Sequence, residues 1–508
     1  MNFNYFDWIA HHAELRGDKA ALINLATRRR VTYGTLDERT DRFATHLASL
    51  GVISGERVAV LAPNTTDILE VQFACFRVGA IFVPVNARLT VHELQFILRD
   101  AGPVVLVHDP EFEAMALELQ RLCAIAHLLQ FGASYEMAIA SSARLTSHVL
   151  GGFDDVSTII YTSGTTGKPK GAMITHGMTF INAVNLSIPA FISHKTVFLC
   201  VLPLFHIGGL NCYTNPVLHA GGVVIIMREF DPGEALRLIG DKTIGLTHFL
   251  GVPAMYQAMT RHPAFTNTDF SRLQIAGIGG APMPVGLLKT WLDRGCALVQ
   301  GYGLTETSPI VLMLDPEDAA RKIGSAGKPV LHTDLKIVDG DGQPVVPGER
   351  GELWVKGPNV TPGYWKQPNA NRTSFTEGWL HTGDVACVDA DGFYYIVDRI
   401  KDMYVSGGEN VYPAEVEDVL YQLPAIAEAS VIGVPDPTWG ETGLAVIVVN
   451  KGAELTEAQV IGHCRERLAR FKCPQEVAFV DALPRNATGK VHKPILRKLF
   501  RRRERPRK

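Results

Sequence analysis

The stretch from Tyr161 to Gly171 carries the strongest chemical signal in the chain, because three glycines, four aliphatic hydroxyls and two lysines fall within it. Glycines allow consecutive backbone N–H groups to point into one concavity, while hydroxyls and ammonium groups add donors and positive charge. A loop of this kind suits the oxygens of a polyphosphate. Its side-chain donors are Thr162, Ser163, Thr165, Thr166, Lys168 and Lys170.

The glycine spacing of this loop excludes a Walker A motif. That motif has four residues between its glycines and a Ser or Thr directly after the lysine. Here Gly164 and Gly167 enclose two residues, and Pro169 follows the first lysine. A dinucleotide-binding fingerprint is also poorly supported, because Pro282 stands where the run beginning at Gly277 needs its third glycine.

Four further segments carry polar residues beside predicted strand ends and turns. The run from Gln300 to Glu306 follows an apolar, strand-like segment at 297–299, and open α/β sheets place ligands at the carboxyl ends of strands. Asp384 ends the run 379–384, and its carboxylate suits paired ribose hydroxyls. The last two segments are a charged break that contains Arg399 and a turn, 484–490, that presents Lys490.

Alternating strand and helix signals surround these segments. Short apolar runs with β-branched residues alternate with helically spaced runs, predicting strands at 57–61 and 80–83 and helices at 66–78 and 90–98. Thr90 and Glu93 form a capping-box pattern at the start of the second helix. The alternation returns at 196–227 and 273–301. Strands that alternate with helices indicate parallel sheets covered on both faces, so we predict an α/β fold.

The pattern changes towards the C-terminus, which predicts a second domain. After Asp334, short strands are separated by Asp-Gly and Pro-Gly turns, and a charged run at 398–402 precedes Gly407-Gly408. We predict a large multi-subdomain N-terminal body (1–397), a hinge (398–401) and a small mobile α+β domain (402–508). In the small domain we expect helices at 415–422 and 455–470 and strands at 429–432 and 445–449. The cleft between the two is the natural ligand site.

Length and composition are typical of a globular protein with several domains in the cytoplasm. A chain of 508 residues with 46% apolar and 20% charged residues is expected to form two or more globular domains. We find no signal peptide and no apolar run long enough to span a membrane. The eight cysteines form no C-x-x-C pair, which favours reduced thiols.

The C-terminal tail from Arg497 to Lys508 has eight cations and one anion. A solvated end is the favoured interpretation, and peripheral contact with anionic lipid is the alternative. We predict no nucleic-acid partner, and a homodimer stays open.

In this order, the loop and the four later segments resemble the adenylate-forming (ANL) superfamily, and within it the acyl-CoA and aryl-CoA ligases. The resemblance covers nearly the whole chain, and long-chain fatty acyl-CoA ligases and feruloyl- or coumaroyl-CoA ligases look about equally similar. It implies ATP, Mg²⁺ and coenzyme A as cofactors. A carboxylate would attack the α-phosphate of ATP and release pyrophosphate, and the coenzyme A thiolate would then displace AMP. Positioning and charge stabilisation dominate such chemistry.

The resemblance also implies roles for single residues in binding the nucleotide. Residues 162–170 would wrap the β- and γ-phosphates, while Glu306, with Thr162 nearby, would ligate Mg²⁺. The adenine would lie between Tyr302 and a glycine-rich turn, and Asp384 and Arg399 would hold the ribose. The remaining implied nucleotide contacts are Gly279, Gly280, Ala281, Gln300, Gly301, Gly303 and Thr305.

Two lysines would separate the two half-reactions. Lys490 would bridge a carboxylate oxygen and the α-phosphate as negative charge builds, whereas Lys401 occupies the hinge about which the small domain turns. The turn would bring Gly407 and Gly408 towards the pantetheine arm of coenzyme A. Trp439 matches a position that contacts coenzyme A in some aryl-CoA ligases, and a surface tryptophan is the alternative. Cys473 stands where some relatives have a phosphate-binding arginine, so the resemblance implies no contact there.

The segment from Pro203 to Leu210 resembles the lining of the acyl pocket. His206 would act as an aromatic gate beside the carboxylate. The remaining implied substrate contacts are Ile207, Gly209, Leu210, Gly279 and Leu304. Burying a charged distal group in so apolar a pocket would be costly, and malonate-type ligases have an arginine where this chain has Gly301. We therefore predict an apolar monocarboxylic acid, fatty or aromatic.

Single residues of this chain disfavour three alternatives to a CoA ligase. A carrier-loading adenylation domain would need an aspartate between Leu199 and Tyr213, and none occurs there. A luciferase-like enzyme would have a lysine where Val405 stands. A non-catalytic nucleotide-binding protein would be expected to lack Lys490 or Glu306, and both are present.

Overall fold

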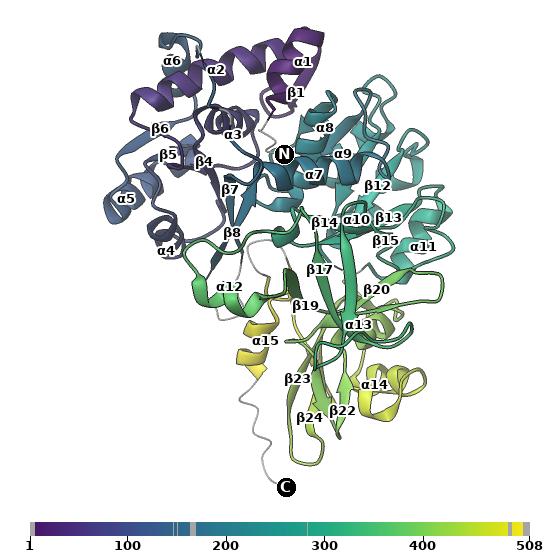
Figure 1. Ribbon diagram of the computed structural model, residues 1–508. Helices are drawn as coiled ribbons and strands as arrows, with labels where there is room; N and C mark the ends of the chain where they lie inside the picture. Colours follow the sequence, from purple (N-terminus) through teal and green to yellow (C-terminus); the bar gives the residue numbers. More distant parts are fainter. Residues whose placement is uncertain are drawn as a thin grey trace.

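Two mainly parallel sheets share a layer of helices in the large body of the molecule (Figure 1). The computed structural model describes residues 6–145, 147–149, 151–162, 169–281, 283–485 and 490–500. Side chains from both sheets and from the helices between them form one continuous core. Helix α3 (Thr66–Val78) is buried at every position except Asp67, as expected for a helix that is enclosed on all sides.

The six-stranded sheet has the order β6-β5-β3-β4-β7-β8. All its pairs are parallel except the β7–β8 hairpin at one edge. Its strands are β3 (Arg57–Leu61), β4 (Ile81–Val85), β5 (Val105–His108), β6 (His127–Gln130), β7 (Val156–Thr162) and β8 (Lys170–Thr175). Its helices, besides α3, are α2 (Tyr33–Ser49), α4 (Val91–Ala101), η1 (Pro110–Phe112), α5 (Glu113–Cys123) and α6 (Ala133–Ser141). The capping box of Thr90 and Glu93 is confirmed at the start of α4.

The nine-stranded sheet has the order β15-β14-β13-β12-β11-β9-β10-β1-β2, with parallel pairs from β13 to β1. Its strands are β1 (Ala20–Asn24), β2 (Arg30–Thr32), β9 (Val197–Cys200), β10 (Val223–Ile226), β11 (His248–Gly251), β12 (Ile275–Ile278), β13 (Leu298–Gly303), β14 (Ile310–Met313) and β15 (Lys328–Pro329). The associated helices are α1 (Trp8–Arg16), α7 (His176–Ser187), η2 (Gly208–Thr214), α8 (Asn215–His219), α9 (Pro232–Gly240), α10 (Pro253–Arg261), η3 (Pro263–Asn267), α11 (Val285–Asp293) and η4 (Thr305–Thr307).

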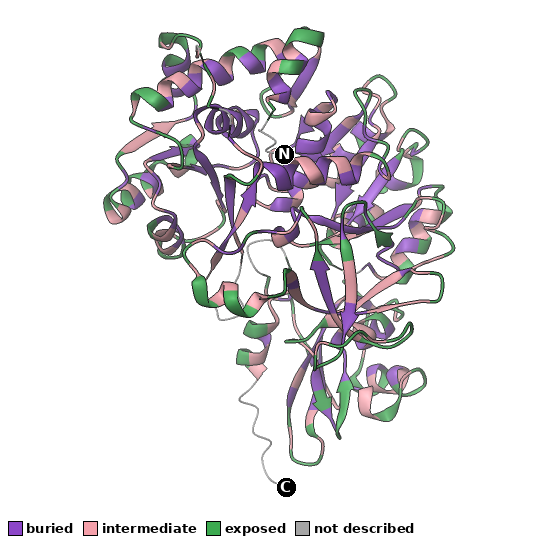
Figure 2. Cartoon of the chain, viewed as in Figure 1, coloured by how far each residue is buried: buried purple, intermediate pink, exposed green. Residues whose placement is uncertain are grey.

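Two smaller sheets follow. An antiparallel five-stranded sheet contains β16 (Asp334–Val338), β17 (Gly351–Lys356), β18 (Phe375–Thr376), β19 (Trp379–Val388) and β20 (Tyr394–Arg399), with α12 (Pro368–Ser374) beside it. The small domain contains β21 (Tyr404–Ser406), β22 (Glu409–Val411), α13 (Pro413–Leu420), β23 (Ile426–Asp436), β24 (Gly440–Val449), α14 (Glu457–Arg465), η5 (Arg470–Lys472), β25 (Glu476–Phe479) and α15 (Lys493–Phe500). The central strands of the two large sheets are mostly buried, whereas β6 is half-buried, β15 is exposed and the outer helix faces are exposed (Figure 2).

The predicted α/β class is confirmed, and two local predictions need correction. The strand expected at 297–299 continues to Gly303, because β14 pairs with it. This pairing brings the Pro309 carbonyl so close to Gly303 that a Cβ there would overlap it. The helix expected at 455–470 is shorter, since Thr456 caps α14 and residues 470–472 form a separate turn. The hinge at 398–401 stays a prediction; its first two residues belong to β20, where Asp398 pairs with Val385 and Arg399 with Asp384.

Candidate active site

The predicted phosphate loop connects the two strands of the β7–β8 hairpin. Thr162 ends β7 directly opposite Lys170, which begins β8, and the Thr162 hydroxyl lies 3.4 Å from the Lys170 carbonyl oxygen. The hairpin therefore fixes both ends of the loop at the edge of the six-stranded sheet. The loop members Ser163, Gly164, Thr165, Thr166, Gly167 and Lys168 lie outside the described residues.

Glu306 is linked to this hairpin by a tyrosine that sequence reasoning missed. The Tyr364 hydroxyl donates to Glu306 Oε1 at 2.8 Å, and Lys170 Nζ lies 5.1 Å from the centre of the Tyr364 ring. Among the described residues no cluster of three or more His, Cys, Asp or Glu could hold a metal. A lone carboxylate still fits Mg²⁺, which proteins hold through one or two carboxylates plus substrate phosphates.

Asp384 is the centre of a second polar cluster. It is 3% exposed; the Tyr302 hydroxyl donates to its Oδ2 at 2.6 Å, and Arg399 Nε lies 3.0 Å from its Oδ1. Burial and then the Asp384 charge raise the pKa of Tyr302 well above its usual range. The three residues come from β13, β19 and β20, so two sheets meet at this cluster. Its arrangement suits a diol such as a ribose.

The predicted adenine-binding glycines lie where β12 and β13 end side by side. Gly279 follows β12, and a Cβ placed on it would lie 3.3 Å from the Gly301 carbonyl oxygen. Gly280 has a φ of +81°, which favours glycine. Gln300 donates to the Ser325 carbonyl at 2.9 Å and is thereby held within the sheet. The other residues predicted to contact the nucleotide lie nearby in the chain. Ala281 is exposed, Gly303 ends β13 and Thr305 is buried at the start of η4.

Lys490 reaches this turn from the small domain. Its Cε lies 3.9 Å from the place where a Cβ on Gly280 would be. Water still reaches the residue, yet the protein around it lowers its pKa to about 8, chiefly through desolvation and then through the charge of Arg399. The carboxylates of Asp384 and Glu306 oppose the shift. One ammonium group therefore lies within electrostatic reach of both polar clusters.

His206 lies in the middle of the segment, Pro203 to Leu210, that is predicted to line an acyl pocket. Its Nδ1 accepts from the Gly208 N–H at 3.1 Å, so the proton of the neutral ring is on Nε2. Burial and the charge of Lys490 lower the pKa of His206 to about 4, which keeps the ring neutral at physiological pH. Ile207 and Leu210 are buried and Leu304 is half-buried. Gly209 has no space for a side chain, because a Cβ would overlap the Pro203 carbonyl.

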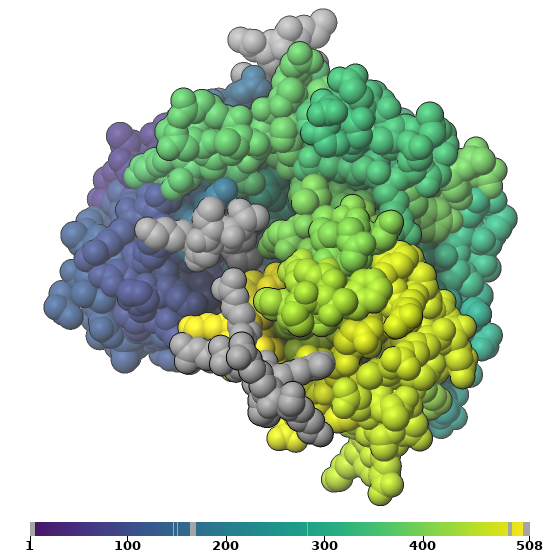
Figure 3. Space-filling model, turned by 90° about the horizontal axis from the view of Figure 1, so that it is seen from below, coloured from purple at the N-terminus to yellow at the C-terminus, as the bar shows by residue number. Residues whose placement is uncertain are grey.

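The small domain is seated against the body (Figure 3). Gln257 of α10 donates to the Ala427 carbonyl at 3.3 Å, and Arg350 lies 3.6 Å from Glu415. Lys401, at the predicted hinge, is exposed and borders a groove of about 1300 Å³ on the small domain. The groove also has Met403, Val434, Ile495 and Arg497 in its wall.

The glycines predicted to approach coenzyme A lie in a tight turn between β21 and β22. Gly407 and Gly408 have φ values of +61° and +88°. The Trp439 ring covers Gly407, since its Cε3 lies 2.5 Å from where a Cβ would be, and the Gly407 N–H donates to the Trp439 carbonyl at 2.8 Å. Trp439 therefore packs on the glycine turn and is half-buried, so it is neither an isolated surface residue nor part of the hydrophobic core.

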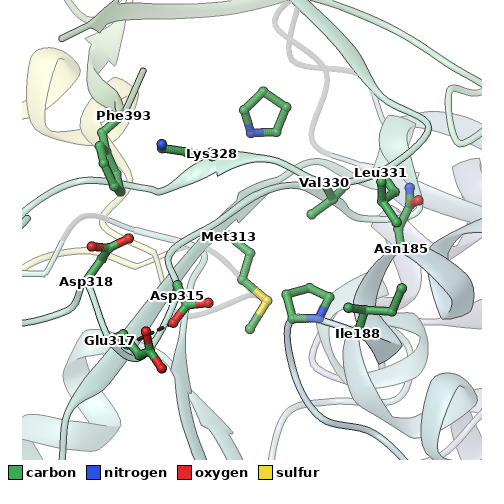
Figure 4. Close-up of a pocket in the computed structure, with 12 residues that line it drawn as sticks. Asn185, Ile188, Met313, Asp315, Glu317, Asp318, Lys328, Val330, Leu331 and Phe393 are labelled. Atoms are coloured by element: carbon green, nitrogen blue, oxygen red, sulfur yellow. Dashed lines mark hydrogen bonds between the residues drawn. The ribbon is translucent and has the colours of Figure 1, made fainter. Parts of the chain in front are cut away.

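Another hollow, of about 410 Å³, lies between the α7–β9 connection and β14–β15 (Figure 4). Ile188, Met313 and Leu331 give it an apolar side, and Asp315 and Asp318 give it an acidic one. None of the predicted site residues lines it. Separately, no helix among the described residues combines the length and the apolar character needed to cross a bilayer.

Lys490 of the small domain thus lies within electrostatic reach of Arg399 and of two carboxylates of the body, an arrangement that suits joining a carboxylate to a nucleotide phosphate. Comparison with known proteins supports this interpretation of the site. Residues 9–365 match the AMP-binding enzyme family, and residues 415–490 match the AMP-binding enzyme C-terminal domain. The chain belongs to the AMP-binding enzyme family.

Individual relatives extend this assignment over the whole chain. A feruloyl-CoA synthase from Amycolatopsis sp is 45% identical over 92% of this chain and 94% of its own length. A long-chain-fatty-acid–CoA ligase, FadD13 from Mycobacterium tuberculosis, is 36% identical over 94% of this chain and 95% of its own length. The o-succinylbenzoate CoA synthetase MenE from Bacillus subtilis, solved with its acyl-adenylate intermediate, superposes with a TM-score of 0.87 at 33% identity, covering 100% of this chain and 99% of that one.

The predicted family, fold and reaction are therefore confirmed. This chain is an acid–thiol ligase that activates an aromatic or fatty carboxylic acid with ATP through an acyl-adenylate. MenE has also been solved with ATP and magnesium ion.

Proposed function

We propose that this chain activates an aromatic monocarboxylic acid and transfers it to coenzyme A. The observation that carries this proposal is the aromatic packing that follows the predicted acyl segment. Three residues after Leu210, the Tyr213 ring packs between Phe198 and His248, with ring centres 5.4 and 5.9 Å apart. Packed rings at this end of the segment would limit the depth available to a long chain. The 45% identity to a feruloyl-CoA synthase, against 36% to a fatty-acid ligase, supports the same choice.

In the first half-reaction, the chain supplies cations and orientation. Bound Mg²⁺ would neutralise phosphate charge and be held by Glu306. Lys490 would contact a carboxylate oxygen and the α-phosphate while negative charge builds there. The neutral ring of His206 would flank the carboxylate without adding a second positive charge. The carboxylate oxygen forms the new bond to phosphorus, and pyrophosphate takes the electrons of the bond that breaks.

Nucleotide binding would fall to the groups that already meet in the cleft. Asp384, oriented by Tyr302 and Arg399, would accept from the two ribose hydroxyls. The hairpin ends at Thr162 and Lys170 would lie beside the β- and γ-phosphates. The narrow space between Gly279 and Gly301 supports an adenine placed close to the backbone.

In the second half-reaction, the small domain would turn about residues 398–401 and withdraw Lys490. The turn of Gly407 and Gly408, covered by Trp439, would then approach the cleft and leave a narrow passage for a thiol. The coenzyme A thiolate attacks the acyl carbon, and AMP leaves with the electrons of the anhydride bond. The domain limits 1–397 and 402–508 are part of this proposal.

A substrate panel tests the proposed acid class. Pyrophosphate release would be measured with benzoates, cinnamates and short- to long-chain fatty acids, each with and without coenzyme A. We expect the highest kcat/KM for an arylalkenoic or arylalkanoic acid, and thioester only when coenzyme A is present. A clear maximum on long-chain fatty acids would refute the aromatic assignment and identify the chain as a fatty-acid ligase.

The lowered pKa of Lys490 predicts an alkaline limit on adenylation. Because the cationic form is needed and the pKa is about 8, acyl-AMP formation should be constant below that value and fall roughly tenfold per pH unit well above it. Thioester formation from supplied acyl-AMP serves as the control and should lack this fall. In Lys490→Arg, whose side chain stays charged, the remaining activity should show no decline near pH 8. The same decline in that variant would contradict the assignment.

Tyr364 is expected to orient the magnesium-binding carboxylate. Tyr364→Phe removes the donor to Glu306 and should raise the Mg²⁺ concentration needed for half-maximal adenylation by roughly tenfold, as is usual for residues that hold a metal ligand. Excess Mg²⁺ should restore the rate. Tyr161→Phe, which removes a hydroxyl bonded to Asp100 at 2.6 Å, is the matched control. An unaltered Mg²⁺ dependence in Tyr364→Phe would show that the contact has no such role.

A further inference from the structure

The first turn of α13 is where polar groups of the body contact the small domain, beside β20 (Figure 1). The Asp398 carboxylate of β20 accepts a hydrogen bond from the Ala414 N–H at 2.9 Å. The guanidinium of Arg350, also from the body, lies 4.9 Å from the centre of the Tyr412 ring and 3.6 Å from Glu415. Two separate segments of the body therefore contact the start of one helix.

Asp398 caps α13 from outside the helix's own segment. Tyr412, the residue before the helix, makes no side-chain cap to any described N–H. By contrast, Thr90 caps α4 and Thr456 caps α14, each from the position directly before its helix. A carboxylate at a helix N-terminus satisfies a free N–H and interacts favourably with the helix dipole. The start of α13 thus takes its side-chain acceptor from the body.

Asp398 itself is held in the body. It lies in β20, where its partner across the antiparallel pair with β19 is Val385. One turn of chain further on, the Ile400 N–H still donates to the Gly383 carbonyl at 3.0 Å. The chain is therefore attached to the five-stranded sheet as far as Ile400, and the Asp398 carboxylate is fixed relative to that sheet.

The residue after the proposed hinge is held in the small domain. Arg497 of α15 lies 3.0 Å from Asp402 Oδ1 and also donates to the Asp402 carbonyl oxygen at 3.3 Å. Lys401 lies between this attachment and the end of β20. A turn of the small domain at Lys401 would therefore carry Ala414 away from Asp398 and break the cap.

A cation beside the Lys490 segment lies near the same carboxylate. Lys493, the first residue of α15, bonds Glu417 Oε1 at 2.9 Å. Burial raises the pKa of Asp398, and the charge of Lys493 opposes that rise. Lys493 comes three residues after Lys490 in the chain. Asp398 thus interacts with α13 through a hydrogen bond and, through charge, with the helix that follows Lys490.

We propose that Asp398 is a positioning residue for adenylation: by capping α13 from the body, it holds the small domain, and Lys490 with it, in the arrangement that forms acyl-AMP. Release of this cap is then part of the turn that precedes thioester formation. The inference rests on the proposed turn of the small domain. It assigns to Asp398 no contact with substrate or nucleotide.

The ratio of the two half-reaction rates tests this role. Each rate constant would be measured in single turnover on the full-length enzyme, adenylation as pyrophosphate release and thioester formation from supplied acyl-AMP and coenzyme A. Asp398→Ala removes the cap that favours the adenylation arrangement. It should raise the ratio of the thioester rate to the adenylation rate by roughly 2- to 30-fold, the factor that corresponds to loss of one N-terminal cap.

Two variants control for a general loss of stability. Thr456→Ala removes the cap of α14, where the Thr456 hydroxyl accepts from the Gln459 N–H at 3.3 Å entirely within the small domain. It should lower the melting temperature much as Asp398→Ala does and leave the ratio unchanged. Asp398→Asn keeps an acceptor of the same shape and should retain most of the wild-type ratio, because Asn caps helices about as well as Asp.

Arg350→Ala tests the same helix start without touching Asp398. Arg350 is exposed, so the variant should fold, and loss of its contact with Tyr412 should raise the ratio about two- to fivefold. An unchanged or lower ratio in both Asp398→Ala and Arg350→Ala would overturn the inference. A ratio that rises as much in Thr456→Ala, or as much in Asp398→Asn as in Asp398→Ala, would overturn it as well.

The measurement separates this inference from the proposals on which it depends. The ratio can be taken with whichever acid the enzyme activates, so a failed aromatic assignment leaves the test intact. If Lys401→Pro slows thioester formation while Asp398→Ala leaves the ratio unchanged, the small domain turns and only the role of Asp398 fails. If neither variant changes the balance of the two half-reactions, the proposed turn fails and the inference fails with it.

Discussion

Lys490→Ala should reduce acyl-AMP formation by roughly 100- to 1000-fold, the usual cost of removing one preorganised group that stabilises charge in a transition state. Lys490 is the small-domain cation placed beside Gly280, and Asp384 and Glu306 lie near enough to affect its pKa. Alanine leaves the cleft intact but removes this charge. The measurement is pyrophosphate release in single-turnover conditions with saturating acid and ATP.

The informative control for Lys490→Ala is the second half-reaction. With acyl-AMP and coenzyme A supplied, the variant should form thioester at nearly the wild-type rate, because Lys490 would be withdrawn in that step. Lys451→Ala changes an exposed lysine of the same domain and should affect neither step. An equal loss in both half-reactions would show that Lys490 has a general structural role instead.

Lys401→Pro should have the opposite effect, with adenylation kept and thioester formation slowed. The Lys401 N–H donates to no described backbone oxygen, so proline removes no such bond in the present arrangement. Proline fixes φ and also restricts Ile400 before it, which hinders the backbone rotation that the hinge needs. A backbone held in an unfavourable region costs of order 1–3 kcal/mol, which corresponds to roughly 10- to 100-fold in rate.

Lys401→Ala separates the backbone effect from the loss of the side chain. Alanine leaves the rotation free, so most of the thioester rate should remain in that variant. Stopped-flow measurement of the two half-reactions in both variants gives the comparison. If Lys401→Pro forms thioester as fast as the wild type, the small domain does not turn at this residue, and the proposed limits of the hinge are wrong.

Individual helices and strands could be predicted because the residue patterns that specify them span only a few positions. The helix at 66–78 agrees with α3, and the strand at 57–61 agrees with β3, since periodicity and capping act over a few residues. The extension of β13 could not be predicted in the same way. Glycines at 301 and 303 are poor strand formers, and only pairing with β14 places them in a strand.

The candidate site was predicted unevenly for a similar reason. Dense motifs identified the hairpin loop, Glu306, Asp384 and Lys490, whereas Tyr364 was missed. It follows a Pro-Gly turn in a stretch without a dense motif, far from Glu306 in the chain. Its aromatic ring directly after that turn is the single signal that could have drawn attention to it.

The order of residues by itself determined the family, the chemistry and the two-domain plan, because these depend on motifs and periodicities that each span about ten residues. The tertiary structure decided which side chains meet. Tyr364 bonds to Glu306 and Lys490 lies against Gly280, both across long separations in sequence. Such contacts follow from strand order and domain seating, which bring distant segments together through packing and hydrogen bonding summed over the whole chain.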